Sequence, residues 1–189
     1  MDTKSKEITQ MEKKNKVFIA TSLDGYIADK NGELDWLHSV PNPDHIDMGY
    51  EAFTSNIDAI LMGRTTFETV CGFDEGWPYQ KPVFVLSNTM TDIPKEFEDK
   101  AHLVKGQLKE VIHSINNKGY NRLYIDGGST IRSFLNADMI DEMIITIIPI
   151  LLGGGSPLFS ESLKRLEFKC TDTKIFLGEV VQNHYKRKR

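Results

Sequence analysis

The stretch Asn121–Leu135, NRLYIDGGSTIRSFL, decides how this chain folds. Its first six residues are mostly apolar and β-prone, which predicts a strand over 121–126. A helical pattern follows and predicts a helix over 129–139. Two adjacent glycines, Gly127 and Gly128, separate the two elements. Glycine lets another group approach the backbone, so this turn is either a close strand–helix contact or a ligand-binding turn.

The same alternation of strands and helices extends in both directions from this stretch. We predict further strands over 16–22, 58–63, 81–88, 101–106 and 141–153, and further helices over 43–53, 64–70 and 107–119. Asp44 is the expected N-cap of the first helix, and Gly119 is the expected C-terminal cap of the third. The closing residues 167–188 are typical of two antiparallel strands joined near Asp172. This order predicts an α/β fold, with a mostly parallel central sheet, helices on both faces and an antiparallel hairpin at the C-terminal edge.

Length and composition limit the classes of protein to which the chain can belong. Its 189 residues suffice for one domain, which we place at 16–189 after a solvated leader at 1–15. A formal net charge of −4 argues against nucleic-acid binding, and no apolar run approaches the roughly 18 residues of a membrane span. The two cysteines, Cys71 and Cys170, lie far apart, which favours a reduced, cytoplasmic protein. The five histidines show no metal-binding spacing, so we expect no metal site.

Three predicted strands end in polar or glycine-rich segments. The segments contain Arg64, Thr65 and Thr66; Ser87, Asn88 and Thr89; and Gly127, Gly128, Ser129 and Thr130. In open α/β sheets ligands bind outside the carboxyl ends of the strands, where helix N-termini present free N–H groups to anions. Each segment also has a structural explanation: a capped helix, a solvated turn or a close strand–helix contact. Neither G-x-G-x-x-G nor the P-loop motif G-x-x-x-x-G-K-[ST] occurs in the sequence.

Taken together and in order, the motifs resemble a known family. They are VFIATSLDGYIADKNGELDWL, AILMGRTTFE, VFVLSNT, LYIDGGSTIRSFL and DEMIITIIPILLGGGSPLF. This series resembles the dihydrofolate reductase-like superfamily. It is most similar to the reductase domain of bifunctional riboflavin-biosynthesis proteins and to that domain's stand-alone bacterial relatives. The resemblance covers roughly residues 16–185 and implies a three-layer α/β/α fold.

The resemblance implies NADPH as the cofactor and assigns residues to it. The implied contacts are Arg64, Thr65 and Thr66 with the 2′-phosphate and pyrophosphate, Ser87 and Asn88 with the adenosine ribose-phosphate, and Gly127, Gly128, Ser129 and Thr130 with the pyrophosphate. A planar guanidinium such as that of Arg64 can bind a phosphate through two parallel hydrogen bonds. In dihydrofolate reductases the bond between the paired glycines is often cis.

The resemblance also implies a nicotinamide-side wall and an active-site lid after the first strand. The matching positions are Ala20, Ser22, Asp24, Gly25, Ile27 and Trp36. A lid would exclude water from hydride transfer. The alternative is a structural turn, with Trp36 in the core. The later Gly153–Gly155 segment resembles a strand exit of the family, and it either lines the substrate side or shapes a bulge.

A catalytic carboxylate is expected on the first helix. In dihydrofolate reductases such an acid lies in the pterin pocket, where apolar surroundings would raise its pKa. Counting back from the MGR motif favours Asp47, with Asp44 and Glu51 as alternatives. Asp44 could instead cap the helix, and Asp47 could instead face water. The segment departs from the family's proline–acid arrangement, which argues against folate as the substrate.

The expected function is that of an NADPH-dependent reductase acting on a pteridine-like or ribosylamino-pyrimidine-like heterocycle. Two alternatives stay open: a reductase of an unrelated carbonyl or imine, and a non-catalytic protein that retains only the nucleotide groove. The H-x-E and P-C-x-x-C motifs of the zinc deaminase domain are absent from the sequence, so the chain is not expected to catalyse the deamination. By resemblance we expect a homodimer formed through the sheet edge, with no nucleic-acid or membrane partner.

Overall fold

The central element of the fold is one large twisted sheet. A computed structural model of the chain describes residues 12–74, 76–159 and 164–189. The sheet contains β1 (Lys14–Ser22), β3 (Ala59–Gly63), β4 (Val83–Leu86), β5 (Ala101–Val104), β6 (Arg122–Asp126), β7 (Glu142–Ile148), β9 (Phe168–Phe176) and β10 (Val180–Arg187). Their order is β5-β4-β3-β6-β1-β7-β10-β9. The strands from β5 to β7 are parallel, whereas β10 runs antiparallel to both β7 and β9.

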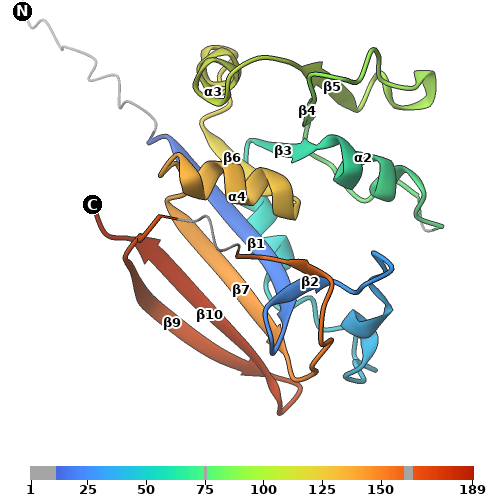
Figure 1. Cartoon of the computed structure of the whole chain (residues 1–189), viewed down its shortest axis with the longest axis vertical. Helices are drawn as coiled ribbons and strands as arrows, with labels where there is room; N and C mark the ends of the chain where they lie inside the picture. The colour runs from blue at the N-terminus through green and yellow to red at the C-terminus, as the bar shows by residue number, and fades with distance from the viewer. Residues whose placement is uncertain (1–11, 75, 160–163) are drawn as a thin grey trace, which may run out of the picture.

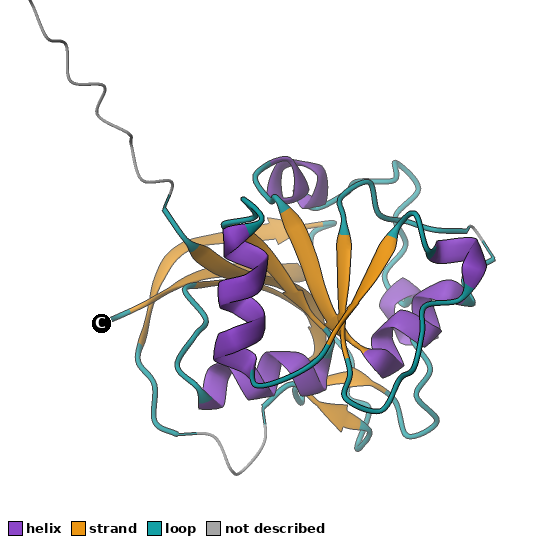
Figure 2. Ribbon diagram, turned by 90° about the horizontal axis from the view of Figure 1, so that it is seen from above, coloured by secondary structure: helices purple, strands orange, loops and turns teal. Residues whose placement is uncertain are grey.

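Helices cover both faces of this sheet (Figure 2). They are α1 (Tyr50–Ser55), α2 (Arg64–Cys71), α3 (Leu108–Asn117) and α4 (Gly128–Asn136), with short 3-10 helices η1 (Asp35–His38) and η2 (Lys95–Phe97). Apolar residues of α3 and α4 pack into one core cluster, which includes Ile115 and Phe134. Phe53 of α1 and Phe67 of α2 pack into the cluster on the other face. The three-layer α/β/α prediction is therefore confirmed.

The antiparallel hairpin lies at the edge of the sheet, as predicted. Figure 1 shows β9 and β10 at one end of the molecule and β4 and β5 toward the other. Seven of the nine residues of β9 are exposed, including Ile175 with 66% of its surface accessible. The strands turn at Leu177 and Gly178 rather than near Asp172, because both of these residues adopt positive φ angles.

The helix predicted over 43–53 is wrong in its bounds. α1 begins only at Tyr50, after His45, Met48 and Gly49 adopt positive φ angles that a right-handed helix cannot contain. Asp44 therefore lies outside the helix, exposed, and is not its N-cap. By contrast, Gly119 follows α3 with φ +96° and donates its N–H to the Asn116 carbonyl, as a C-terminal cap should.

Several strand boundaries also differ from prediction, and two of them have a clear cause. β1 begins at Lys14, because Lys14, Asn15 and Lys16 pair with β6. β7 ends at Ile148, before Pro149, whose missing N–H cannot continue the ladder. Residues 1–11 of the predicted leader lie outside the described part of the chain. Within the described ranges, no helix has the length and apolar character of a membrane span.

Candidate active site

The carboxyl ends of the central parallel strands meet along one edge of the sheet. β1, β3 and β6 are neighbours, with Ala59 opposite Leu123 and Lys16 opposite Tyr124. Parallel pairing places the segments that follow these strands side by side. The predicted Arg64 and Gly127 segments are thus brought together. The Ser87 segment follows β4, which pairs with β3 and so continues the same edge.

The start of α2 packs directly against the glycine turn before α4. Gly127 has φ +84°, and a Cβ added there would lie 2.1 Å from the Thr66 Oγ1. A Cβ on Gly63 would likewise lie 2.9 Å from the Thr130 Oγ1. Only glycine fits Gly127, because both its φ angle and the space around it exclude a side chain. Close packing of the two helix starts therefore explains why residue 127 is a glycine.

The two helix starts at this edge have no side-chain cap. Gly63 is the N-cap residue of α2, Gly127 is that of α4, and neither supplies a side chain to bind the free N–H groups of the first turn. The first turns of both helices also lack an acidic residue. Two adjacent uncapped helix N-termini carry partial positive charge, and together they suit an anion such as a pyrophosphate. All peptide bonds in the described ranges are trans, including Gly127–Gly128.

Arg64 lies at the outer end of this edge. Its side chain is half exposed, and its Nε donates to the Glu68 Oε1 at 2.7 Å, one helical turn away. Thr65 and Ser129 are exposed, whereas Thr130 is buried. An exposed ion pair contributes little stability, so the guanidinium of Arg64 can exchange Glu68 for a phosphate at small cost.

Ser87 and Asn88 stabilise the turn after β4. The Ser87 Oγ accepts the N–H of Met90 at 3.0 Å, and the Asn88 Oδ1 accepts the N–H of Gly106 at 2.9 Å. Ser87 is buried, whereas Asn88 is exposed and keeps its amide nitrogen available. We predicted both as polar donors to the cofactor. In this structure both oxygens serve the local fold, which leaves the amide of Asn88 as the more available donor.

The loop after β1 is tied to the glycine-rich segment after β7. The Asp24 carboxylate accepts the Ser22 hydroxyl at 2.6 Å and the N–H of Gly153 at 2.8 Å. These hydrogen bonds lower the pKa of Asp24, the one from Ser22 most strongly. The short strands β2 (Tyr26–Ala28) and β8 (Ser156–Pro157) also pair, so the two loops form one unit (Figure 1).

This loop unit reaches the glycine turn. A Cβ on Gly128 would lie 2.5 Å from the Ile27 Cδ1, so Ile27 packs against the turn. A Cβ on Gly155 would lie 2.1 Å from the Ala28 carbonyl oxygen, which shows why this segment is rich in glycine. Gly25 accepts the N–H of Leu158 through its carbonyl. Of the four predicted lid residues in this loop, Ile27 contacts the glycine turn, whereas Ser22, Asp24 and Gly25 bind within the loop and to the segment after β7.

Trp36 lies in the core rather than at the surface of the lid. It is 8% exposed and packs with Val40, Ile148 and Val180, while the partly buried Ala20 packs against the same cluster. The indole Nε1 of Trp36 has no hydrogen-bond partner among the described residues. Trp36 is therefore a core residue, as in the alternative prediction, and the lid role proposed for it stays untested.

An acid that the sequence analysis did not select lies beside Gly127. Asp126 ends β6, and its carboxylate accepts the Tyr79 hydroxyl at 3.0 Å and the N–H of Gly127 at 2.8 Å. The residue as a whole is half-buried, but its carboxyl end is enclosed, and this burial raises the pKa of Asp126. A sequence signal existed: an acidic residue ends an otherwise apolar strand directly before two glycines.

Tyrosines surround this carboxyl group. Burial raises the pKa of Tyr50 to about 12 and raises the pKa values of Tyr79 and Tyr124, with the charge of Asp126 as a second cause for each. The Tyr124 hydroxyl also donates to the Phe18 carbonyl at 2.9 Å. The cluster therefore surrounds a carboxyl group of raised pKa with phenols whose pKa values are also raised.

Asp47, the predicted catalytic acid, has the opposite environment. Its exposed carboxylate accepts the N–H groups of Gly49 and Glu51, both at 2.9 Å, at the start of α1. These backbone hydrogen bonds lower the pKa of Asp47, that from Glu51 most, so the raised pKa that we expected is wrong for this residue. Glu51 is also exposed. In this structure Asp47 acts as a helix cap, and its catalytic role stays an untested prediction.

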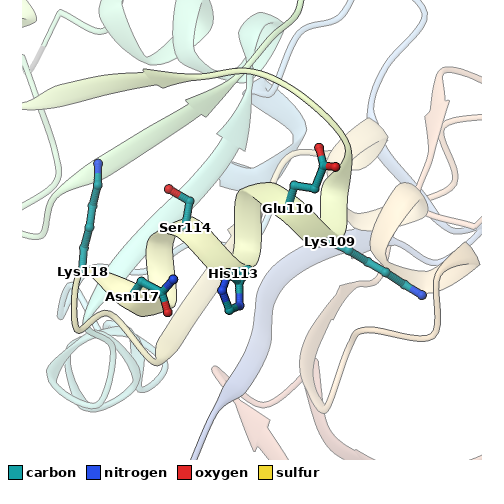
Figure 3. A pocket seen from close by; sticks show the side chains of 6 residues that line it. All are labelled: Lys109, Glu110, His113, Ser114, Asn117 and Lys118. Carbon is teal, nitrogen blue, oxygen red and sulfur yellow. The ribbon is translucent and has the colours of Figure 1, made fainter.

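A surface hollow of about 570 Å³ lies elsewhere and lacks the character of a site. It is lined by residues of α3 and Lys118, and Figure 3 shows these side chains pointing in different directions rather than toward one point. His113 is exposed there. Within the described ranges, no group of three or more His, Cys, Asp or Glu side chains is arranged to hold a metal ion.

Comparisons with known proteins agree with this fold. The family model of the RibD C-terminal domain matches residues 16–181. The uncharacterized protein YwjB of Bacillus subtilis (strain 168) is 35% identical over 180 residues, covering 94% of this chain and 99% of its own length. A solved Shewanella sp. PV-4 protein, whose name assigns it provisionally to riboflavin biosynthesis, is 57% identical with a TM-score of 0.91, covering 93% of this chain and 99% of that one.

A more distant comparison concerns the fold alone. Dihydrofolate reductase from Enterococcus faecalis, solved with NADP(H) and RAB-propyl, aligns with a TM-score of 0.64 at 16% identity. The alignment covers 93% of this chain and 97% of the reductase. At this identity the likeness establishes a shared architecture, which includes the strand-end edge described above.

Proposed function

Because the chain belongs to the RibD C-terminal domain family, we propose that it is an NADPH-dependent reductase of a small heterocycle. The coarser part of this statement, a reductase-like function, is supported by the family and by the dihydrofolate reductase architecture. The observation that carries the proposal is the contact between two uncapped helix starts, where Gly127 meets Thr66.

The residues at this edge fit a dinucleotide. The N–H groups of the first turns of α2 and α4 would bind the pyrophosphate, and Arg64 would bind the 2′-phosphate that distinguishes NADPH from NADH. The absence of a side chain at Gly127 and Gly128 allows the approach. Asn88, Ser129 and Thr130 would contribute further polar contacts. When bound, the cofactor supplies the hydride.

We propose Asp126 as the group that supplies the matching proton. Burial raises its pKa, which increases the share of the protonated form relative to an exposed Asp, and Tyr79 and Gly127 hold its two oxygens in place. Reduction of a C=N bond requires one hydride at carbon and one proton at nitrogen. A neutral carboxyl group beside the glycine turn can donate that proton and can also bind an amide-like ring edge. Asp47 remains the alternative acid.

The substrate that we propose is a ribosylamino-pyrimidine or a related pteridine-like ring. The name of the Shewanella protein links that relative to riboflavin biosynthesis, and the family carries the same association. An enclosed carboxyl group among phenols suits a planar, hydrogen-bonding heterocycle. By family resemblance we further propose that the protein is cytoplasmic and pairs as a homodimer, with the exposed β9 as the pairing edge.

Titration of the purified protein with NADPH and with NADH, followed by cofactor fluorescence, tests the first step. We expect NADPH to bind at least about tenfold more tightly, and Arg64→Ala to remove most of this preference. Lys105→Ala is the matched control, because it removes a cationic side chain that is not assigned to the groove. Absence of binding by either nucleotide would refute the cofactor assignment.

A screen of NADPH oxidation with dihydrofolate, pyrimidine and simple imine acceptors tests the second step. Turnover with a ribosylamino-pyrimidine but not with dihydrofolate is the expected result. Binding of NADPH without turnover of any acceptor would favour the non-catalytic nucleotide-binding alternative.

A further inference from the structure

A second pocket, of about 380 Å³, lies beside α1 and has no part in the proposed reaction. Its lining shares no residue with the strand-end groove or with Asp126. It contains side chains from β1, α1, β7, β10 and β9, so it spans the sheet between the parallel strands and the closing hairpin. Its volume falls within the range of small-molecule sites.

The sheet forms an apolar floor for this pocket. Strand register places Phe18 opposite Ile144, and Ile144 opposite His184, so their side chains project from the same face. Phe53 packs on Phe18 with ring centroids 5.1 Å apart. Phe53 in turn packs edge-on against the buried Tyr124 at 5.1 Å, which fixes this wall in place. The apolar surface is therefore preformed.

The side of the pocket formed by α1 carries few side-chain atoms. Gly49, Ala52 and Asn56 line the pocket at helical spacing, and the first two have almost no side chain. The Asn56 amide is turned back to the Ala52 carbonyl at 2.9 Å. Small residues on this side of α1 leave the floor uncovered, although the same helix buries Phe53 on its neighbouring side.

The charges around the pocket leave a cation available for a ligand. The Glu142 carboxylate is bound by the Nζ of Lys14 at 3.0 Å and of Lys16 at 3.1 Å, so its charge is already neutralised. At the other end, the Lys174 Nζ lies 3.6 Å from the Asp172 Oδ2, which is long for an ion pair, and both side chains are about half exposed. Such an exposed pair is weak, so the Lys174 ammonium can bind a ligand anion instead.

A neutral acceptor lies next to Lys174. The buried Gln182 donates its amide nitrogen to the Met48 carbonyl at 3.0 Å, which directs its Oε1 toward the His184 Nε2 at 3.1 Å. The Nε2 must therefore carry the proton, and the Nδ1 of His184 is left as an acceptor. Burial lowers the pKa of His184, and the charge of Lys174 lowers it further, whereas Asp172 and Glu142 act in the opposite direction. The net lowering of the pKa favours this neutral form.

We propose that this pocket is a second binding site, for a planar aromatic anion, with the ring against Phe18, Phe53 and Phe176 and the acidic group at Lys174. The apolar floor provides most of the binding free energy, and the cation fixes the orientation. The site is independent of the reductase proposal, because it shares no lining residue with the groove.

Titration of the full chain with 8-anilinonaphthalene-1-sulfonate, a planar aromatic sulfonate whose fluorescence rises on binding, tests this site. We expect one saturable site per chain. Ala52→Trp fills the pocket and should weaken binding by about tenfold or more, while Lys174→Glu should weaken it about three- to tenfold. The matched controls are Ser55→Trp on α1 and Lys169→Glu on β9, which do not line the pocket and should change nothing.

Two measurements distinguish this pocket from the cofactor groove and from a dimer interface. Arg64→Ala should leave probe binding unchanged, because Arg64 lies outside the pocket; displacement of the probe from the wild type by NADPH would overturn the proposal. Sedimentation should show the same oligomeric state for the wild type and for Ala52→Trp. If the probe fails to bind and Ala52→Trp converts a dimer to a monomer, a second copy of the chain occupies the pocket and the proposal is wrong.

Discussion

Two regions of this protein use the same residue types before a helix and reach opposite results. Asp126 and Gly127 precede α4, and Asp47 and Gly49 precede α1, with φ near +85° at both glycines. At α1 the carboxylate caps the free N–H groups, faces water and has a lowered pKa. At α4 the carboxylate is enclosed by tyrosines and has a raised pKa.

The difference lies in where each segment meets the sheet. Asp126 is the last residue of a central strand, so its carboxyl group lies inside the packed layer beneath α1 and α2. Asp47 lies in a loop at the surface. Loss of solvent disfavours the charged form, whereas backbone N–H donors favour it. The same residue types thus give an enclosed acid with a raised pKa before α4 and an exposed helix cap with a lowered pKa before α1.

Replacing Asp126 and Asp47 by asparagine should give the largest difference in turnover between the two regions. Asp126→Asn is expected to lower the turnover number by about 100-fold or more, because the proton donor is lost, while NADPH affinity stays within about threefold. Asp47→Asn should leave turnover near that of the wild type. Steady-state kinetics with the best acceptor from the screen measures both. Normal turnover by Asp126→Asn together with inactive Asp47→Asn would restore Asp47 as the acid.

Replacing Gly127 and Gly49 by alanine compares how tightly the two turns are packed. Gly127→Ala should destabilise the fold by about 2–4 kcal/mol, because a left-handed φ and an overlap with Thr66 act together. Gly49→Ala should cost only about 1–2 kcal/mol, since a Cβ there meets nothing within 4 Å. Urea unfolding gives both values. Equal losses at the two positions would show that the turn before α4 relaxes freely.

The pH dependence of stability should differ in sign between the two regions. The raised pKa of Asp126 means that its native environment penalises the charged form, so this penalty grows as the pH rises above about 4, the unfolded value. Asp126→Asn should therefore gain stability relative to the wild type on going from pH 4 to pH 7. Urea midpoints at several pH values measure this gain. If the difference in urea midpoint between Asp126→Asn and the wild type did not change with pH, the carboxyl group of Asp126 would not be enclosed as described.

Removing the cap at α1 should have the smallest effect. Asp47 has a lowered pKa, so its contribution is present above about pH 4 and is lost as the pH falls through the native value. Asp47→Ala should lower the urea midpoint at pH 7, by less than Gly127→Ala does, and its difference from the wild type should shrink as the pH falls below about 4. Asp47→Ser, which keeps a capping oxygen, is the control. A difference from the wild type that does not shrink with falling pH would show that charge is not involved.

Local patterns in the sequence were enough to predict much of this protein. The apolar run of 121–126 and the helical pattern after it predicted β6 and α4, and their repetition predicted the α/β fold. The polar strand ends predicted an edge at which the Arg64 and Gly127 segments meet, and the structure brings them together. The strands and helices follow from the periodicity of the apolar residues. The shared edge follows from the parallel pairing that this order of elements predicts.

Only the tertiary structure decided which carboxylate is enclosed. Asp47 and Asp126 are the same residue type, and burial comes from residues distant in sequence, such as Tyr50 and Tyr79 around Asp126. The start of α1 was also missed, because positive φ angles at His45 and Met48 are not signalled by residue type. Periodicity fixes elements and their order, whereas pKa values depend on solvent exclusion by the assembled layers.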